Sequence, residues 1–413
     1  MNADQRPTAE MTGDDSPSPL PKGRDGMSSW RARKSTLTHQ HMITTQQTSQ
    51  AGRESVTGIH NTAGKLACIK LAVDVHAAKF KVVRQLGDLS AQPGQTFTPE
   101  QYLKFASRQV ELAEKVWCCY EAGPTGFWLH RELTKRGVQT LVVVPARLDA
   151  YGRKVNNDRN DARALASKLS RYVAGEKEAL AVVRVPTPEQ ESRRALSRQR
   201  GQFGKTLRSV AAMGRSACLL AGYRLRGPWW RRQSRWLKLC AELPPGLQEH
   251  LERFRPLMAE AEKQIALLTK SLQAAAPKQL PIGMGALTFS QIEREVLDWH
   301  RFSNRKQPAS FAGLCGGVSA SGQQHADLPI TKHGNPRLRV LLIEWAWRMV
   351  IFQPQARAVQ RWKNVLLDRR VHARRRKQAI VALARQLLVD LWRWRTGRAT
   401  AEKLGWRISS AAA

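Results

Sequence analysis

The first ordered part of the chain alternates apolar runs with segments of helical period. The run LACIKLAVDV at 66–75 is apolar and β-branched, which predicts a buried strand, and the alternating segment 79–87 predicts a second strand paired with it in a hairpin. Further buried strands are predicted at 116–122 and 139–146, and helices at 98–115, 125–137 and 158–175. Strands that alternate with helices indicate an α/β domain.

The middle of the chain has the period of long helices. Two candidates, 188–223 and 243–276, flank the segment 224–238, and we expect them to form an antiparallel hairpin or coiled coil. A Pro- and Gly-rich stretch at 277–288 then marks a boundary. Beyond it we expect a smaller, mainly helical domain with a Gly- and Ser-rich loop at 312–324.

These patterns divide the chain into five parts. The polar, aperiodic segment 1–65 is predicted to be disordered. The α/β domain follows, then the helical hairpin, the C-terminal domain and a short tail, at 66–186, 187–276, 277–400 and 401–413. Within the C-terminal domain, 338–352 is apolar on most faces and predicts a core helix, and a basic run at 374–377 follows in what we expect to be the C-terminal tail.

The charge balance indicates a protein that binds a polyanion. Lys and Arg number 68 against 33 Asp and Glu, a formal net charge of +35. Nucleic acid is the usual partner of such an excess, because each neutralised phosphate releases a counterion. A membrane surface is the rival, but no segment supplies the roughly 18 consecutive apolar residues of a spanning helix, so we expect no membrane partner.

The six cysteines favour a reducing compartment over a metal ribbon. None of them forms a C-x-x-C pair, and Cys118 and Cys119 lie in an apolar run, which predicts buried, reduced thiols. The N-terminal stretch lacks the apolar segment of a signal peptide. A cytoplasmic location fits both observations.

Four carboxylates fall where an α/β sheet places its active site. Asp74 ends the first predicted strand, and Glu121 ends a later one. Asp158 and Asp161 lie in the first turn of a predicted helix, at a spacing that puts them on one face. Such a cluster suits Mg²⁺, or Mn²⁺ in its place, which stabilises the attacking and leaving oxygens of phosphodiester transfer. Each acid alone has a structural alternative as a helix-dipole partner or turn cap, but the set favours a metal site.

The second stretch with candidate chemistry is the Gly- and Ser-rich loop and the basic turn after it. Ser321 precedes a glycine, and Ser319 is an equal candidate nucleophile on chemistry alone, although either serine can instead be a turn residue. Asn335 and Pro336 fit the start of a helix. Four residues are placed to meet phosphate: Lys332, His333, Arg337 and Arg339.

Several segments resemble one known family. LAVDVHAAKFKV, CYEAGPTGFWLHREL and NNDRNDARALA are similar, in order, to the acidic motifs of the bacterial insertion-sequence transposases numbered one-ten, whose DEDD domain is shaped like Holliday-junction resolvases. Three later motifs are similar to the C-terminal serine domain of the same family: AGL, then SG six residues further on, then ITK-x-GN-x-x-LR. The resemblance covers about residues 66–400.

The resemblance implies a fold and a mechanism. The fold is a ribonuclease-H-like α/β N-terminal domain, a long coiled-coil hairpin and a mainly α C-terminal domain. The four acids Asp74, Glu121, Asp158 and Asp161 become the Mg²⁺ ligands. Ser321, the serine before glycine, becomes the nucleophile that forms a covalent phosphoserine link to DNA before strand exchange. The sequence departs from the family pattern at 315–317 and 327–329.

The resemblance also implies the partners: DNA of the element ends and target, and a non-coding bridge RNA. A recombinase that holds two duplexes is expected to be a homodimer or homotetramer, associated with the bacterial nucleoid. Aromatic rings stack on bases and Arg binds phosphate, although tryptophans at a hairpin tip equally pack on a partner helix. The candidate contacts are Lys154, Arg159, Arg163, Trp229, Trp230, Arg231, Arg232, Lys332, Arg337 and Arg339.

Three alternatives stay open on the sequence. A metal-dependent, junction-resolving nuclease would use water as its nucleophile, and Ser321 would be incidental. An inactive derivative of the element would bind nucleic acid without strand transfer. The segment 281–288 is either the phosphate-gripping hairpin of a helix–hairpin–helix or a plain linker.

Overall fold

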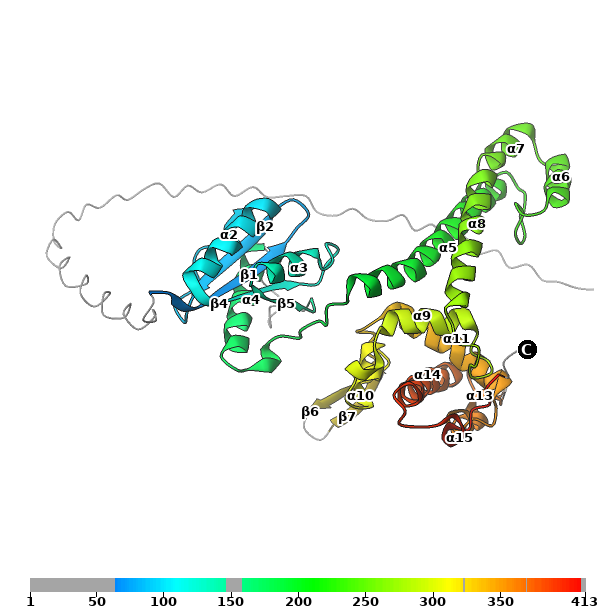
Figure 1. The fold of residues 1–413 in the computed structure, drawn as a ribbon. Coiled ribbons are helices and arrows are strands. Elements are labelled where there is room, and N and C mark those ends of the chain that lie inside the picture. Colours follow the sequence, from blue (N-terminus) through cyan, green and yellow to red (C-terminus); the bar gives the residue numbers. More distant parts are fainter. Residues whose placement is uncertain (1–63, 146–157, 322–323, 369, 410–413) are drawn as a thin grey trace, which may run out of the picture. The chain divides into compact units, whose positions relative to one another are not determined.

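The computed structural model describes residues 64–145, 158–321, 324–368 and 370–409 (Figure 1). Within these ranges the side chains of residues 158–161 and 318–327 are not described. The chain divides after Val182 into two compact units. None of the described helices is both long enough and apolar enough to cross a membrane. The tail predicted at 1–65 lies outside the described residues except for its last two, and stays a prediction.

A five-stranded mixed sheet forms the centre of the first unit. Its strands are β1 (Leu66–Val75), β2 (Phe80–Leu86), β3 (Gln95–Phe97), β4 (Ala113–Glu121) and β5 (Gln139–Val143), in the order β3-β2-β1-β4-β5. β1 pairs antiparallel with β2 and parallel with β4, and β4 pairs parallel with β5. The predicted strands and the first hairpin are confirmed. The hydrophobic pattern missed β3 because none of its side chains is buried.

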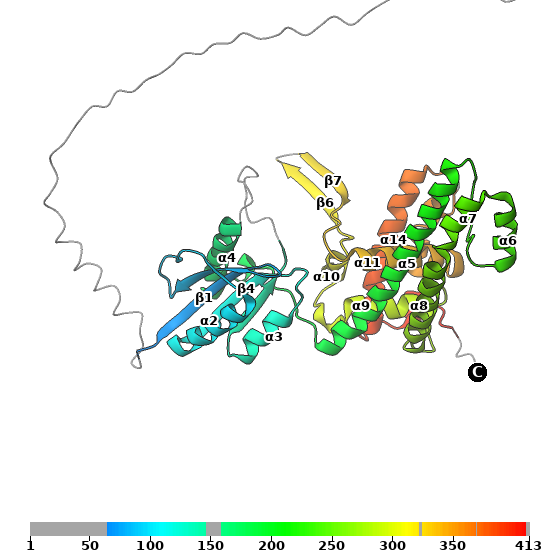
Figure 2. The ribbon, with the colours of Figure 1, turned by 90° about the horizontal axis from the view of Figure 1, so that it is seen from above.

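Helices cover both faces of this sheet (Figure 2). They are α2 (Pro99–Leu112), α3 (Trp128–Lys135) and α4 (Asp158–Val173), with a 3₁₀ turn at Lys177–Ala179. α4 packs on one face, where Cys119 joins its apolar cluster with Leu165. On the opposite face Cys118 lies 3.2 Å from the hydroxyl of Tyr102 in α2, as strand alternation requires. Thr98 begins α2 with a full capping box, which it forms with Gln101.

The second unit begins with a pair of long helices that pack in opposite directions. Its first four helices are α5 (Pro188–Leu220), α6 (Gln233–Glu242), α7 (Pro245–Glu252) and α8 (Arg255–Ala274). Near one end, Arg200 of α5 donates to Thr269 of α8 at 2.7 Å. Near the other end, Gly214 lies beside Leu251 of α7. α5 and α8 therefore run antiparallel along each other.

The single helix predicted over 243–276 is wrong, because the chain forms α7 and α8 with a break between them. Pro256 has no backbone N–H to donate to the carbonyl of Glu252, four residues earlier, so the helical hydrogen bonds of α7 cannot continue through it. The break therefore falls just ahead of this proline. The connecting segment 224–238 is also partly helical, since α6 begins within it at Gln233.

The tryptophans at this end of the unit form a small core. Trp229 and Trp236 are 1% and 5% exposed and pack with Leu251 and Met258. A Cβ on Gly214 would lie 2.5 Å from the Trp229 ring, so only glycine lets the ring close onto α5. The burial of Trp229 favours packing over base stacking, which the sequence left open, whereas Trp230 is only half-buried.

The rest of the second unit is a helical core that carries one small two-stranded sheet. The apolar cluster centres on two long helices, Pro336–Phe352 and Ala373–Arg395, where Trp345 and Leu387 have no exposed surface. The elements are α9 (Ala286–Val296), a 3₁₀ turn (Trp299–Arg301), α10 (Lys306–Phe311), β6 (Gly316–Ser321), β7 (Gln324–Ile330), α11 (Pro336–Phe352), α12 (Arg357–Gln360), α13 (Lys363–Leu366), α14 (Ala373–Arg395) and α15 (Ala401–Leu404).

Two expectations for this region need correction. The Gly- and Ser-rich stretch 312–324, predicted as a loop, supplies strand β6 of an antiparallel hairpin. Its small residues gave no apolar signal, and the backbone groups of the hairpin pair with each other across its two strands. The basic run 374–377, assigned to a C-terminal tail, forms the start of α14. The core helix predicted at 338–352 is confirmed, within α11.

The segment 281–288 packs as a linker. The amides of Leu280, Ile282 and Met284 already donate within the protein, to Ser409, Arg407 and Pro281 at 3.1, 2.9 and 2.8 Å. The carbonyl of Gly283 accepts from Arg348 of α11 at 2.8 Å. These amides are occupied, so the structure favours the linker interpretation over a phosphate-gripping hairpin.

Candidate active-site residues

The register of the central strands places two of the predicted acids side by side. Val73 of β1 pairs with Tyr120 of β4 in parallel, and Asp74 and Glu121 each follow one residue later. Two residues before them, Ala72 and Cys119 belong to the cluster under α4. Because side chains alternate along a strand, Asp74 and Glu121 share the sheet face that α4 covers.

Helix α4 runs antiparallel to these strands. Lys70, early in β1, donates at 3.0 Å to the hydroxyl of Ser170, late in α4. Further along, the thiol of Cys119 lies 4.0 Å from the carbonyl oxygen of Leu165. The start of α4 therefore lies toward the carboxyl ends of β1 and β4.

The other two predicted acids occupy that start. Asp158 is the first residue of α4, and Asp161 precedes Leu165 by one turn, about 6 Å. Glu121 follows Cys119 by two strand residues, about 7 Å. The backbone thus carries all four acid positions to one end of the first unit. The side chains of Asp158 and Asp161 are outside the description.

Metal ligation is accordingly not tested by the structure. Among the side chains that it describes, no group of three or more His, Cys, Asp or Glu is arranged to hold a metal ion. Only Asp74 and Glu121 of the four predicted ligands belong to that described set. The metal site therefore stays a prediction.

His76 is a neighbour of this site that the sequence analysis did not single out. Its Nε2 lies 3.2 Å from Oδ2 of Asp74, whose side chain is 27% exposed. The signal was the Asp-x-His spacing, since residues two apart in an extended chain point to the same side. The contact places the imidazole against the Asp74 carboxylate.

The cysteines beside the acids are unsuited to act as thiolates. Burial raises the pKa of Cys118 to about 12. Burial, together with the charges of Cys118 and Glu121, raises the pKa of Cys119 well above its usual value. Both residues are free and buried, which confirms the prediction of reduced thiols. Neither thiol is therefore a candidate nucleophile beside the predicted acids.

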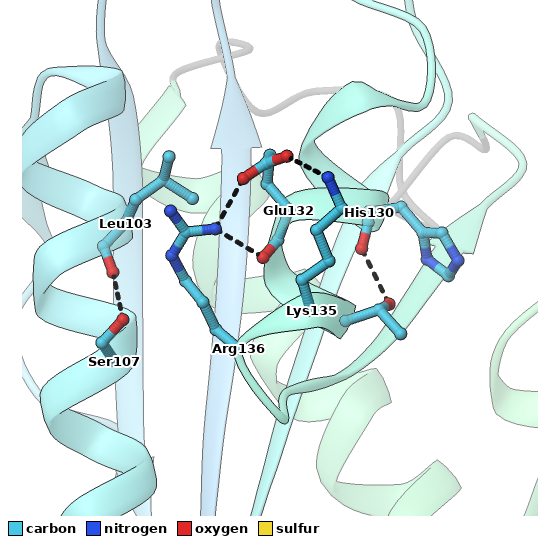
Figure 3. Close-up of polar contacts among 7 residues, drawn as sticks. Leu103, Ser107, His130, Glu132, Lys135 and Arg136 are labelled. Carbon is cyan, nitrogen blue, oxygen red and sulfur yellow. Dashed lines mark hydrogen bonds and ion pairs between the residues drawn. The ribbon is translucent and has the colours of Figure 1, made fainter.

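Glu132 on α3 is an acid that the same unit uses structurally. Figure 3 shows its carboxylate between Lys135 and Arg136, at 3.0 and 2.7 Å. Hydrogen bonds from Arg136 and Lys135 lower the pKa of Glu132. α3 packs on the sheet face opposite α4, so this ion-pair group is separate from the predicted acid set.

The candidate nucleophile lies at the end of a β-hairpin. Ser321 is the last residue of β6 and pairs with Gln324, and Ser319 pairs with Ala326. The serines are two residues apart, so both belong to one face of the ribbon. Their side chains are outside the description, and the choice between them rests on the family resemblance.

A tightly packed loop holds the base of this hairpin. Gly334 has φ +130°, and a Cβ there would lie 2.5 Å from the carbonyl oxygen of Phe311. Gly313 has φ +65°, and a Cβ there would lie 2.5 Å from the carbonyl oxygen of His333. Both positions require glycine, for backbone conformation and for space. The loop and the end of α10 therefore form one close-packed joint.

Asn335 and Arg339 fasten that joint. Asn335 caps α11 by accepting from the amides of Arg337 and Leu338, as its predicted place at a helix start implies. The guanidinium of Arg339 donates to the carbonyls of Ala312 and Lys332 at 2.9 and 3.2 Å. Arg339, a candidate phosphate contact, thus has a structural partner on each side of the joint.

The other candidate nucleic-acid-binding residues differ in how exposed their side chains are. Lys332 and Arg337 are exposed, and Lys332 has the left-handed φ of +58°. Arg163 and Arg232 are exposed, whereas Arg231 is paired with Glu262 at 2.6 Å. Lys154 lies outside the described residues, and so does the side chain of Arg159.

Sequence reasoning missed Glu295, the buried carboxylate that connects three helices. It lies in α9, is 1% exposed, and accepts from Arg198 of α5 at 3.0 Å and from Asn335 at 2.7 Å. Burial acts to raise its pKa, but hydrogen bonds from Arg198 and Asn335 outweigh burial and lower the pKa. A lone Glu in a helix gives no sequence signal, because both partners are remote along the chain.

Comparison with known proteins places this geometry in context. A profile described as the transposase IS116/IS110/IS902 family matches residues 279–361, which include the serine hairpin and the glycine loop. The putative transposase y4rJ of Sinorhizobium fredii is 33% identical over 302 residues, covering 66% of this chain and 75% of that protein.

Two further relatives extend the similarity. The putative transposase y4qE of Sinorhizobium fredii is 31% identical over 373 residues, covering 82% of this chain and 88% of that protein. The transposase for insertion sequence element IS1111A of Coxiella burnetii is 28% identical over 286 residues, covering 65% of this chain and 74% of that protein. The similarity therefore includes both units.

Proposed function

The chain belongs to the IS116/IS110/IS902 family of transposases, and from that membership we propose that Ser321 attacks DNA while four acids hold Mg²⁺. The observation that carries the proposal is the arrangement of the first unit, where β1, β4 and α4 bring Asp74, Glu121, Asp158 and Asp161 to one end. The order and mixed pairing of the sheet support a ribonuclease-H-like fold.

The acids fit the metal by the chemistry of their donors. Carboxylate oxygens are the hard ligands that Mg²⁺ prefers, and Mn²⁺ accepts the same set. When bound, the metal would stabilise charge on the scissile phosphate. His76 would keep the Asp74 carboxylate oriented through its 3.2 Å contact.

The proposed strand transfer conserves phosphodiester bonds. The Oγ atom of Ser321 forms a bond to the scissile phosphorus, the bond to one bridging oxygen breaks, and the serine proton ends on the leaving oxygen. A hydroxyl of the second strand then attacks the phosphoserine, which restores a phosphodiester and the serine hydroxyl. Because one ester replaces another at each step, the exchange requires no external energy source.

The test is a covalent adduct between protein and DNA. We expect the full chain, incubated with Mg²⁺, labelled DNA from the ends of its own element and RNA transcribed beside it, to give a labelled band that survives denaturing electrophoresis. Ser321→Ala abolishes this band, and Ser319→Ala, its matched control on the same strand, retains it. Asp74→Ala lowers adduct formation at least about 10³-fold.

Other outcomes point to the alternatives. Cleavage without an adduct, unchanged in Ser321→Ala, would identify a nuclease that uses water. DNA binding that survives Asp74→Ala, with no Mg²⁺-dependent strand transfer in either form, would identify an inactive derivative. Either result overturns the proposed serine mechanism.

The proposed partners are target and element DNA, a bridge RNA, and further copies of this chain. The net charge of +35 supports binding of more than one nucleic-acid strand. The helical pair supports self-association, since Leu220, Leu257 and Leu267 are 88%, 60% and 54% exposed. We expect light scattering to give the mass of a dimer or tetramer. The site of action would be the nucleoid.

A further inference from the structure

A large basic pocket lies between α14 and the base of the serine hairpin. Its volume is about 1630 Å³, well above the roughly 300–1000 Å³ of small-molecule sites. Gly316 and Leu328–Ile330 of the hairpin form part of its wall. Eight of its lining residues are Lys or Arg, and none is Asp or Glu. Its size and charge suit a polyanion.

The pocket face of α14 results from the helix pattern. Leu383, Leu387 and Leu391 have no exposed surface and pack into the core. Arg374, Lys377 and Arg385 lie on the other side of the helix, are exposed, and line the pocket. The core therefore fixes the direction of the basic row.

These cations lack anionic partners within the described part of the chain. Of the pocket's Lys and Arg residues, Arg393 alone has an ion pair there, with Asp390 at 4.0 Å. A cluster of like charges repels itself and opposes folding. A bound anion would relieve that repulsion, and release of its counterions would add to affinity.

The aromatic rings of the pocket argue against base stacking. Trp392 is 4% exposed, and the guanidinium of Arg398 lies 4.3 Å from its ring centroid. Arg361 lies 5.7 Å from the ring of Trp362. Since arginine or neighbouring side chains already cover these faces, the pocket offers charge to phosphate and little surface to bases.

We propose that this basic pocket binds the phosphate backbone of a DNA duplex, independently of base sequence, and leads it along the hairpin toward Ser321. The part of this inference that directs the DNA toward Ser321 rests on the proposed function. Ser321 lies five strand residues beyond Gly316, about 17 Å from the pocket wall. DNA is favoured because the hairpin that carries the DNA nucleophile is itself part of that wall.

The test compares two variants of equal charge change. Arg374→Ala/Lys377→Ala/Arg385→Ala removes the pocket row, and Arg208→Ala/Lys263→Ala/Lys270→Ala removes three exposed cations from α5 and α8. Fluorescence anisotropy of the full-length proteins measures binding of two DNA duplexes of unrelated sequence and of an RNA duplex, over a series of salt concentrations.

The pocket variant should bind both DNA duplexes roughly 100-fold more weakly near 0.15 M salt, with a salt slope smaller by about three. The control variant should change by less than about threefold. The melting temperature of the pocket variant should equal that of the native chain or lie slightly above it. Misfolding is then excluded as the cause of the weaker DNA binding.

Three results would overturn the proposal: equal losses in the two variants, a loss that differs between the DNA sequences, or a loss confined to RNA. Failure of the proposed function would look different. If Ser321→Ala still forms the adduct, the serine mechanism fails while the binding result stands. If the pocket proposal is right, Ser321→Ala binds DNA with unchanged affinity, and the pocket variant regains the adduct at saturating DNA.

Discussion

Gly313 and Gly397 adopt almost the same left-handed backbone, with φ of +65° and +71°, in different surroundings. A Cβ on Gly313 would lie 2.5 Å from both the Arg339 side chain and the His333 carbonyl. A Cβ on Gly397 would have no atom within 4 Å. Gly313 therefore combines a conformational requirement with a steric one, and Gly397 has the first alone.

The pair gives a prediction at the residue scale. Gly397→Ala should destabilise the protein by about 1 kcal/mol, the cost of the backbone conformation. Gly313→Ala should cost at least about 2 kcal/mol more, because the joint below the serine hairpin must open. Urea denaturation measures both values. Equal losses would show that the joint is not tightly packed.

Single residues also show where sequence reasoning ends. The glycine and asparagine of the turn before α11 stand out in the sequence, and the start of that helix follows from Asn335 and Pro336. The partner of Gly313 does not stand out, because His333 is twenty residues away. Contacts set by tertiary packing leave no mark on local periodicity.

At the scale of elements, Glu295 determines how α9, α5 and α11 meet. Its carboxylate is shared between a guanidinium on α5 and the residue that caps α11. Removal leaves Arg198 without its charge partner and the cap without an anchor. Glu295→Ala should therefore cost about 3 kcal/mol in urea denaturation. The control is Glu249→Ala, whose exposed pair with Arg253 should contribute less than about 0.5 kcal/mol.

The pH dependence of this contribution has a defined sign. The folded pKa of Glu295 lies below its ordinary value of 4.5, so the stabilisation is complete above that value and is lost as pH falls through the folded pKa. The stability gap between the native chain and Glu295→Gln should narrow as pH drops below about 4. A constant gap from pH 7 to pH 3 would assign the effect to packing.

Elements with a buried face were predictable, and those without one were not. β1, β2, β4, β5 and the helices of the first unit followed from apolar periodicity and one capping box. β3 has no buried side chain and escaped notice, and the small and polar residues of β6 and β7 gave no strand signal in the sequence. The break before α8 follows from Pro256, and helical periodicity on each side of it obscured that signal.

At the scale of the whole molecule, the charge of +35 is the dominant property. Self-repulsion of this size lowers the stability of the folded chain, and salt screens it. The melting temperature should therefore rise by roughly 5 °C between about 0.05 and 0.5 M NaCl. The pocket variant, with three cations removed, should show a smaller rise. A fall or no change would mean that the charges are already balanced within the fold.

The candidate site was predictable in its parts. Strand ends and a helix start indicated the positions of the acids, and register and helix direction now bring those positions to one end of the first unit. The serine belongs to the second unit, and periodicity carries no information on whether it acts on the same phosphate as the acids of the first unit. Family resemblance supplied that connection.

The parallel register of β1 and β4 has a genetic consequence. An in-frame deletion of one codon within 66–73 shifts every later side chain of β1 to the other face, so Asp74 would point away from α4. A codon lost from the exposed turn at 88–91 leaves both strands in phase. Loss of three nucleotides from codons 66–73 should thus inactivate a copy of this element. The same loss from codons 88–91 should leave the copy active.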